Sequence, residues 1–249
     1  MLNRTLVIAQ QTFQDGMAGL LMRAYLLLIL LVVVLSWFAA ELAIIEPNAF
    51  RLAITVALVR PLTAVVVILQ ICGGFNEAAR TGQLQLVLSM DLSRSQYLTG
   101  RMIGGAGFAG LVAVATIFAV APWSGWEATL IWATSLFFEM LLMSLFTLFV
   151  AVTFSSLGAA VLLSLSFYLL CRFIEPFVLM ASASDTGLVS GFLVGLSWLL
   201  PNFGRYSQSS WLVYGDGNIG ILSALLFEVL VVGSVLYLAA LIDFNRREI

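Results

Sequence analysis

The chain has 249 residues, of which 62% are hydrophobic and only 10% carry a charged side chain. Soluble globular domains contain about 25% charged residues, so this composition excludes a soluble protein and indicates a polytopic α-helical membrane protein. The net charge of −2 says nothing about nucleic acid, and no basic patch indicates it, so we expect no nucleic-acid partner. The lack of histidine and lysine excludes an imidazole metal site and a nucleotide-binding phosphate loop.

Residues 1–20 are predicted to form an amphipathic helix. Apolar side chains recur every three or four residues, and polar side chains occupy the positions between them. This pattern predicts an interfacial helix that lies along the membrane surface with its apolar face toward the lipid. The alternative is a plain cytoplasmic start to the first membrane span.

Six apolar stretches, each long enough to cross a bilayer, follow this helix. They cover residues 22–40, 52–72, 98–120, 128–152, 157–180 and 219–242. Arginines gather on one side of these spans (Arg4, Arg23, Arg80, Arg94, Arg101, Arg246 and Arg247), whereas only Arg51 and Arg205 lie on the other. The positive-inside rule therefore predicts that both termini and the connection of residues 73–97 are cytoplasmic. We find no internal repeat and predict one all-α transmembrane domain over residues 1–249.

The longest connection on the opposite, extracytoplasmic side covers residues 181–218. It contains an apolar stretch, residues 191–203, that is too short to cross the membrane and is interrupted by Pro201. We predict a re-entrant or interfacial helix in this connection. The alternative is a seventh span, which would place the two termini on opposite sides of the membrane.

Five charged side chains lie inside the predicted spans, in the middle or outer half of the membrane: Arg60, Glu139, Arg172, Glu175 and Glu228. Charges at this depth are costly unless they are paired or hydrated, and they usually face the interior of a helix bundle. The near balance of sign favours a network of interhelical ion pairs. The functional alternative is a polar lining or gate of a substrate path.

The third span carries several glycines, and the spacing of Gly100 and Gly104 allows two helix backbones to approach closely. Packing within the chain is the simpler interpretation, and a contact between two copies is the alternative. No catalytic constellation is recognisable, because a serine hydrolase without histidine or lysine would need an unusual base. Cys72 and Cys171 lie within apolar runs and predict neither a disulfide nor a metal site.

The connection of residues 73–97 is too long for a simple turn. A helix break is predicted at Thr81-Gly82, followed by an apolar run that is too short to span the membrane. Ser93 and Gln96 have the spacing of a capping box, which would start the helix of the third span. We interpret the segment as a short transverse helix that docks into a groove on a partner protein. An ordinary solvated loop is the alternative.

The pattern Glu77-x-x-x-Thr81-Gly82-x-Leu84-x-Leu86-x-Leu88-Ser89-x-x-x-Ser93-Arg94-x-x-Tyr97-x-x-Gly100-Arg101 resembles the cytoplasmic coupling segment of ATP-binding-cassette exporter permeases of the type-2 class. The resemblance extends to the amphipathic N-terminal helix, the six spans, the long outer connection and the basic end of the chain. Residues 200–215 also resemble a stretch of the subgroup associated with multicopper-enzyme maturation. The chain departs from the family at Asp91 (usually proline), at Thr81-Gly82 (usually in reverse order) and at Arg101 (usually lysine).

The resemblance implies a permease subunit in the inner membrane of a bacterium, paired with a second permease subunit that is either identical or a sister chain. A separate cytoplasmic nucleotide-binding subunit would supply the ATPase, with ATP and magnesium, so this chain would hold no cofactor and would not be an enzyme itself. Membrane lipid and a periplasmic accessory protein are further implied partners. The implied ATPase-coupling residues are Glu77, Arg80, Thr81, Gly82, Leu84, Leu86, Leu88, Ser89, Ser93 and Arg94.

Two other functions are compatible with the same residues. The intramembrane charges would serve an ATP-independent secondary transporter or channel by carrying coupling ions. The chain would alternatively be an assembly or chaperone subunit that transports nothing. The sequence does not define the cargo in any of these cases.

Overall fold

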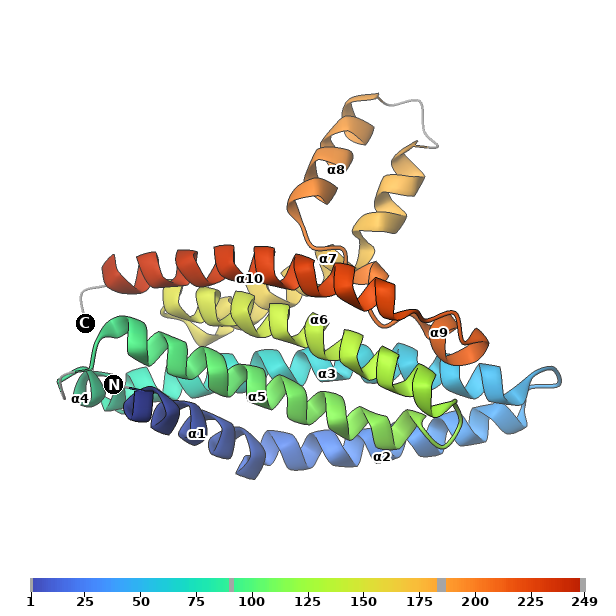
Figure 1. Cartoon of the computed structure of the whole chain (residues 1–249), viewed down its shortest axis with the longest axis horizontal. Helices are drawn as coiled ribbons and strands as arrows, with labels where there is room; N and C mark the ends of the chain where they lie inside the picture. Colours follow the sequence, from blue (N-terminus) through green and yellow to red (C-terminus); the bar gives the residue numbers. More distant parts are fainter. Residues whose placement is uncertain (1, 90–91, 183–186, 247–249) are drawn as a thin grey trace.

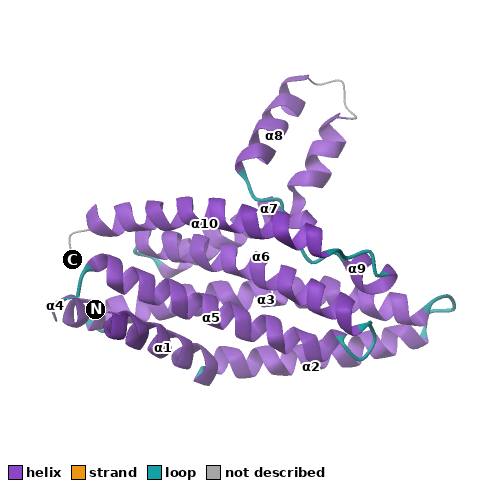
Figure 2. Cartoon of the chain, in the orientation of Figure 1, coloured by secondary structure: helices purple, strands orange, loops and turns teal. Residues whose placement is uncertain are grey.

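The computed structural model describes residues 2–89, 92–182 and 187–246. All regular structure within these ranges is helical (Figure 2). Six helices are long and apolar enough to cross a membrane, which confirms the prediction of an all-α, multi-pass membrane protein. They are α2 (Leu20–Glu41), α3 (Pro47–Arg80), α5 (Arg94–Val120), α6 (Trp126–Thr153), α7 (Leu157–Ser182) and α10 (Ile219–Arg246).

Five shorter elements accompany the six long helices: α1 (Leu2–Ala18), α4 (Gln83–Ser89), α8 (Gly187–Leu199), the 3-10 helix η1 (Phe203–Arg205) and α9 (Ser209–Tyr214). Most helix ends lie within a few residues of the predicted spans. The exception is α3, which extends well beyond the predicted 52–72 at both ends. It begins at Pro47, whose fixed φ suits the first helical position, and it continues through Gly73 and Gly74 because two glycines alone do not end a helix.

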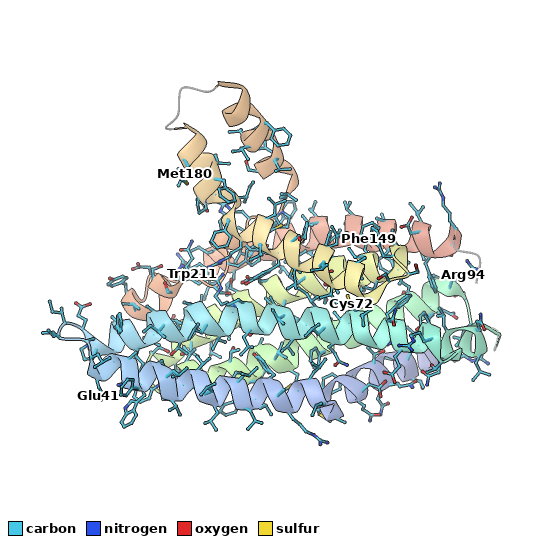
Figure 3. All side chains as sticks on the ribbon, turned by 180° about the vertical axis from the view of Figure 1, so that it is seen from behind. Glu41, Cys72, Arg94, Phe149, Met180 and Trp211 are labelled. Carbon is cyan, nitrogen blue, oxygen red and sulfur yellow. The ribbon has the colours of Figure 1, made fainter. Side chains whose placement is uncertain are left out.

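The long helices lie side by side in one bundle, and α6 is at its centre (Figure 1). In its most apolar window, 67% of the α6 residues are buried, against 22% for α10. The termini of the described chain and α4 lie at one end of the bundle, which we call the α4 end. Arg94 at that end and Glu41 at the other mark the length of the bundle in Figure 3. The assignment of the α4 end to the cytoplasm remains a prediction.

Helix α1 packs lengthwise against the first part of α5. Ile8 faces Gly100, Thr12 faces Gly104 and Gly16 faces Phe108, so the contacts advance in the same direction along both helices. We expected a helix that lies flat on the membrane surface. The packing instead aligns α1 with the spans, because the glycines of α5 leave a groove that accepts the α1 backbone.

The side chains of α1 are divided accordingly. Ile8 and Ala9 are buried against the bundle, whereas Leu6, Val7 and Met17 are about half exposed or more. The apolar face read from the sequence is therefore shared between α5 and the surroundings. The packing role predicted for Gly100 and Gly104 is filled within the chain, by α1.

Part of the connection after α7 stands away from the bundle (Figure 1). Pro176 lies inside α7, where a proline removes one helical hydrogen bond and favours a kink. The end of α7 and α8 then form a projecting arm, marked by Met180 in Figure 3. Helix α8 has 13 residues, too few for a seventh span. It begins and ends earlier than the predicted 191–203.

The arm is apolar and open to its surroundings. Met180 is 70% exposed and Trp198 is 87% exposed. Apolar side chains with this exposure favour a place in lipid or against another protein.

Candidate functional site

The α4 end contains the predicted coupling segment, and the backbone there follows the prediction. Helix α3 ends at Arg80, and Gly82 has a φ of +72°, a left-handed conformation that glycine adopts without steric cost. The seven residues of α4 follow directly. The predicted helix break and the predicted short helix are both present.

The two faces of α4 have different surroundings. Leu84 is 5% exposed and belongs to the hydrophobic core, whereas Leu86 is 59% exposed. Glu77, Arg80 and Thr81 are exposed beside it at the end of α3. Leu84 is thus a packing residue of this chain, and Leu86 is the apolar side chain presented outward. The side chains of Leu88 and Ser89, and the whole of Asp91, lie outside the described residues.

The predicted capping box at the start of α5 is confirmed. The Ser93 hydroxyl accepts a hydrogen bond from the Gln96 amide at 3.3 Å, and the Ser93 amide donates to the Gln96 side-chain oxygen at 3.2 Å. This reciprocal pair satisfies two backbone donors at the helix terminus. It fixes the residue at which α5 begins.

Arg94 has an internal role that the sequence did not reveal. Its Nη1 donates to the backbone carbonyls of Phe244 at 2.9 Å and Asn245 at 3.0 Å, at the end of α10. Phe244 is fully buried and stacks on Tyr97 of α5, with ring centroids 5.9 Å apart. Phe75 of α3 packs edge-on against the Phe244 ring, with ring centroids 6.5 Å apart. These contacts hold α3, α5 and α10 together at the α4 end.

We expect Arg94→Gln to loosen the end of α10 while the rest of the bundle stays intact. Loss of the two carbonyl contacts should cost about 1 kcal/mol locally. Amide hydrogen exchange of residues 240–246 should accelerate, with Arg80→Gln, at an exposed arginine of the same end, as the control. Unchanged exchange in residues 240–246 would show that Arg94 does not hold this helix.

A buried polar cluster lies further along the bundle. Arg60 of α3 and Glu139 of α6 form an ion pair at 3.1 Å, and both side chains are almost fully buried. The same Arg60 nitrogen, Nη2, also donates to the carbonyls of Phe203 and Tyr206. Arg172 of α7 donates to the Phe203 carbonyl at 2.7 Å. Both arginines therefore bind the backbone of one segment, residues 202–207, which we call the anchored loop.

Helix α6 holds the anchored loop from its other side. Ser207 has a φ of +45°, which is unfavourable for a residue other than glycine. Its amide donates to Ser135, its carbonyl accepts from the Trp132 indole at 2.8 Å, and its hydroxyl donates to Glu139. These α6 residues are spaced by three and four positions and share one helix face. That spacing was a signal available in the sequence.

The remaining acids complete the attachment. Glu175 accepts a hydrogen bond from the Asn202 side chain at 3.0 Å, and Asn202 in turn accepts one from the Gly204 amide. Burial, followed by the nearby charge of Glu228, raises the pKa of the Tyr206 phenol. The expected network of ion pairs is therefore corrected. Among the described residues one pair forms, and the other three charges lie around the anchored loop, because its unpaired backbone groups compete for them.

A cavity of ≈ 520 Å³ lies between α3, α7 and the residues that follow the anchored loop. Arg60 and Arg172 line it, together with Tyr168 and Gln208. Within the described ranges, no group of three or more histidine, cysteine, aspartate or glutamate side chains could hold a metal ion. The arrangement can position a polar ligand and hold charge. No protein-family model matches the sequence, and a comparison with proteins of curated function finds no match.

Proposed function

We propose that this chain is the transmembrane subunit of an ATP-driven exporter, in which two permease subunits form the substrate path and a separate cytoplasmic ATPase binds α4. The observation that carries the proposal is the short helix at the end of the bundle, with Leu84 packed inward and Leu86 presented outward. A partner with an apolar groove would cover this outward-facing leucine, as in other complexes where a helix docks into a groove. The resemblance of residues 77–101 to a coupling segment supports the same function.

The fold offers a route from α4 to the polar cluster. Helix α3 is unbroken from Pro47 to Arg80, and Arg60 lies within it. A displacement of α4 by the ATPase would move α3, and with it the Arg60 guanidinium that binds the anchored loop. Binding and hydrolysis of ATP would thereby change the position of Arg60 in the wall of the cavity between α3 and α7. The nucleotide and its magnesium ion would belong to the partner subunit.

The test is Leu86→Asp, which places a charge on the outward face of α4. We expect the tagged chain, purified from its native host in mild detergent, to lose its nucleotide-binding subunit and the associated ATPase activity. A charge that must be desolvated in an apolar groove costs several kcal/mol, so the loss should be about a hundredfold or more. The variant should still insert and fold, because Leu86 is not part of the core.

Gln85→Asp is the matched control, since it adds the same charge to a neighbouring exposed position of the same helix. It should retain the ATPase subunit. If Leu86→Asp retains the subunit and the full ATPase activity, α4 is not the docking element. If the wild-type chain purifies without any ATPase even after cross-linking, the exporter proposal is wrong.

A secondary transporter is the second candidate, favoured by the buried Arg60–Glu139 pair. It predicts flux in proteoliposomes without an ATPase, abolished by Glu139→Gln or Glu228→Gln. The exporter predicts no such flux. A subunit with an assembly function would form a stable complex and show no flux under either condition.

A further inference from the structure

The cavity between α3 and α7 has an unusual distribution of charge. Two arginines line it, Arg60 and Arg172, and no carboxylate is among its lining residues. Arg60 is neutralised by Glu139 at 3.1 Å. Arg172 donates to the Phe203 carbonyl, and no carboxylate in the described part of the chain lies within ion-pair distance of it. Of the two cations that line the cavity, only Arg60 has a carboxylate within ion-pair distance among the described residues.

The depth of Arg172 in the membrane makes its charge significant. Arg172 lies within the span α7 and is partly buried. A cation at such a depth is costly unless it is paired, hydrated or bound to backbone carbonyls, as Arg172 is to Phe203, and such residues commonly mark substrate pathways. Glu175, one turn away, accepts a hydrogen bond from Asn202 and does not line the cavity. A negatively charged ligand in the cavity would give Arg172 an ionic partner.

The remaining walls indicate the rest of the ligand. Gln208, Ser209 and Ser210 add hydrogen-bonding groups on one side. On the other side, Leu169 and Phe173 of α7 line the cavity and are 52% and 49% exposed. The cavity is thus continuous with an apolar surface. Its volume of ≈ 520 Å³ is that of a typical small-molecule site.

We propose that this cavity binds an amphiphile with a single acidic head group, such as a carboxylate or a sulfonate, whose charge is held by Arg172 and whose apolar chain lies along α7. The assignment of this ligand as the exported substrate rests on the proposed function. Binding itself requires only this chain.

The first measurement is equilibrium binding of a fluorescent fatty acid, dansyl-labelled undecanoic acid, to the purified chain in nanodiscs of phosphatidylcholine. The acid should bind at least about tenfold more tightly than its neutral methyl ester, because only the acid gains the ionic contact. Arg172→Gln should remove this difference while leaving ester binding unchanged. Arg60 still donates to the Phe203 carbonyl, so the anchored loop should stay in place. Arg172→Lys should retain part of the preference.

Arg205→Gln is the control, since Arg205 is exposed on the same segment and does not line the cavity. It should bind the acid as the wild type does. Equal binding of acid and ester by the wild type would overturn the proposal. So would an acid preference that survives in Arg172→Gln.

Two competition experiments identify the source of the ligand. Displacement of the probe when about a third of the nanodisc lipid is phosphatidylglycerol would assign a membrane lipid. Displacement by octanesulfonate but not by phosphatidylglycerol would assign a single-chain amphiphile. An acid preference that depends on Arg172, in a chain without an ATPase partner, would refute the exporter and keep this site. If the chain has an ATPase partner but binds the acid no better than the ester, the exporter stands and this binding site is refuted.

Discussion

Replacing Arg60 by methionine should lower the free energy of unfolding by about 3–5 kcal/mol, the usual cost of breaking a buried ion pair. Glu139 is completely buried, and without Arg60 its charge has no ionic partner among the described residues. The carbonyl of Tyr206 loses its arginine donor at the same time. The measurement is thermal unfolding in detergent, followed by intrinsic tryptophan fluorescence, to which the buried Trp132 contributes.

The double variant Arg60→Met/Glu139→Leu separates these two losses. It removes the unpaired charge, so it should recover much of the stability that the single variant loses. The recovery should stay incomplete, since the anchored loop still lacks the arginine. Arg205→Met, at an exposed arginine, should change stability by no more than about 0.5 kcal/mol. If Arg60→Met alone matches the wild type, the ion pair contributes nothing to the fold.

Gly104→Ala should detach α1 from the bundle. A Cβ atom at this position would lie 2.6 Å from the Thr12 Cβ and 2.8 Å from the Ala9 carbonyl oxygen. Both atoms are fixed to the α1 backbone, so the clash is relieved only if α1 moves away. We expect faster amide hydrogen exchange over residues 5–16 and a loss of about 1–3 kcal/mol, typical of overpacking.

The adjacent Gly105→Ala is a closely matched control. Its Cβ would meet Ile71 at 3.6 Å and Ser144 at 3.9 Å, which are ordinary contact distances. Both substitutions raise the helix propensity of α5 by the same amount. The difference between the two variants therefore isolates the contact with α1. If both leave the exchange of residues 5–16 unchanged, the lengthwise packing of α1 is wrong.

Much of the local structure could be predicted from the sequence because it depends on near neighbours. The capping box of Ser93 and the left-handed Gly82 are determined by a few consecutive residues, and the spans follow from length and apolar content. The direction in which each span faces could not be predicted. A span that is apolar all round has no polar face to orient it, so the contact of Phe244 with Tyr97 was not predictable. On α4, Leu84 and Leu86 are the same residue type, so nothing in the sequence distinguished the buried one from the exposed one.

The polar cluster was likewise predictable only in part. The five intramembrane charges were identifiable, because charged residues in apolar spans are conspicuous. Their principal partner was not, because the backbone of residues 202–207 has no side-chain signal for hydrogen bonding. Gly100 and Gly104 likewise predicted a close approach between helices without indicating that α1 is the helix that approaches.

Helix α3 has a further mechanical property. Pro61 directly follows Arg60 and leaves the Ala57 carbonyl without its helical donor, so the helix is most compliant at the level of the ion pair. From Pro61 to Arg80 the helix is about 28 Å long at 1.5 Å per residue. If it pivots at Pro61, a rotation of about 10° moves the α4 end by about 5 Å. In such a rotation the Arg60–Glu139 ion pair would lie next to the pivot, so a large displacement of the α4 end would move the Arg60 guanidinium only slightly.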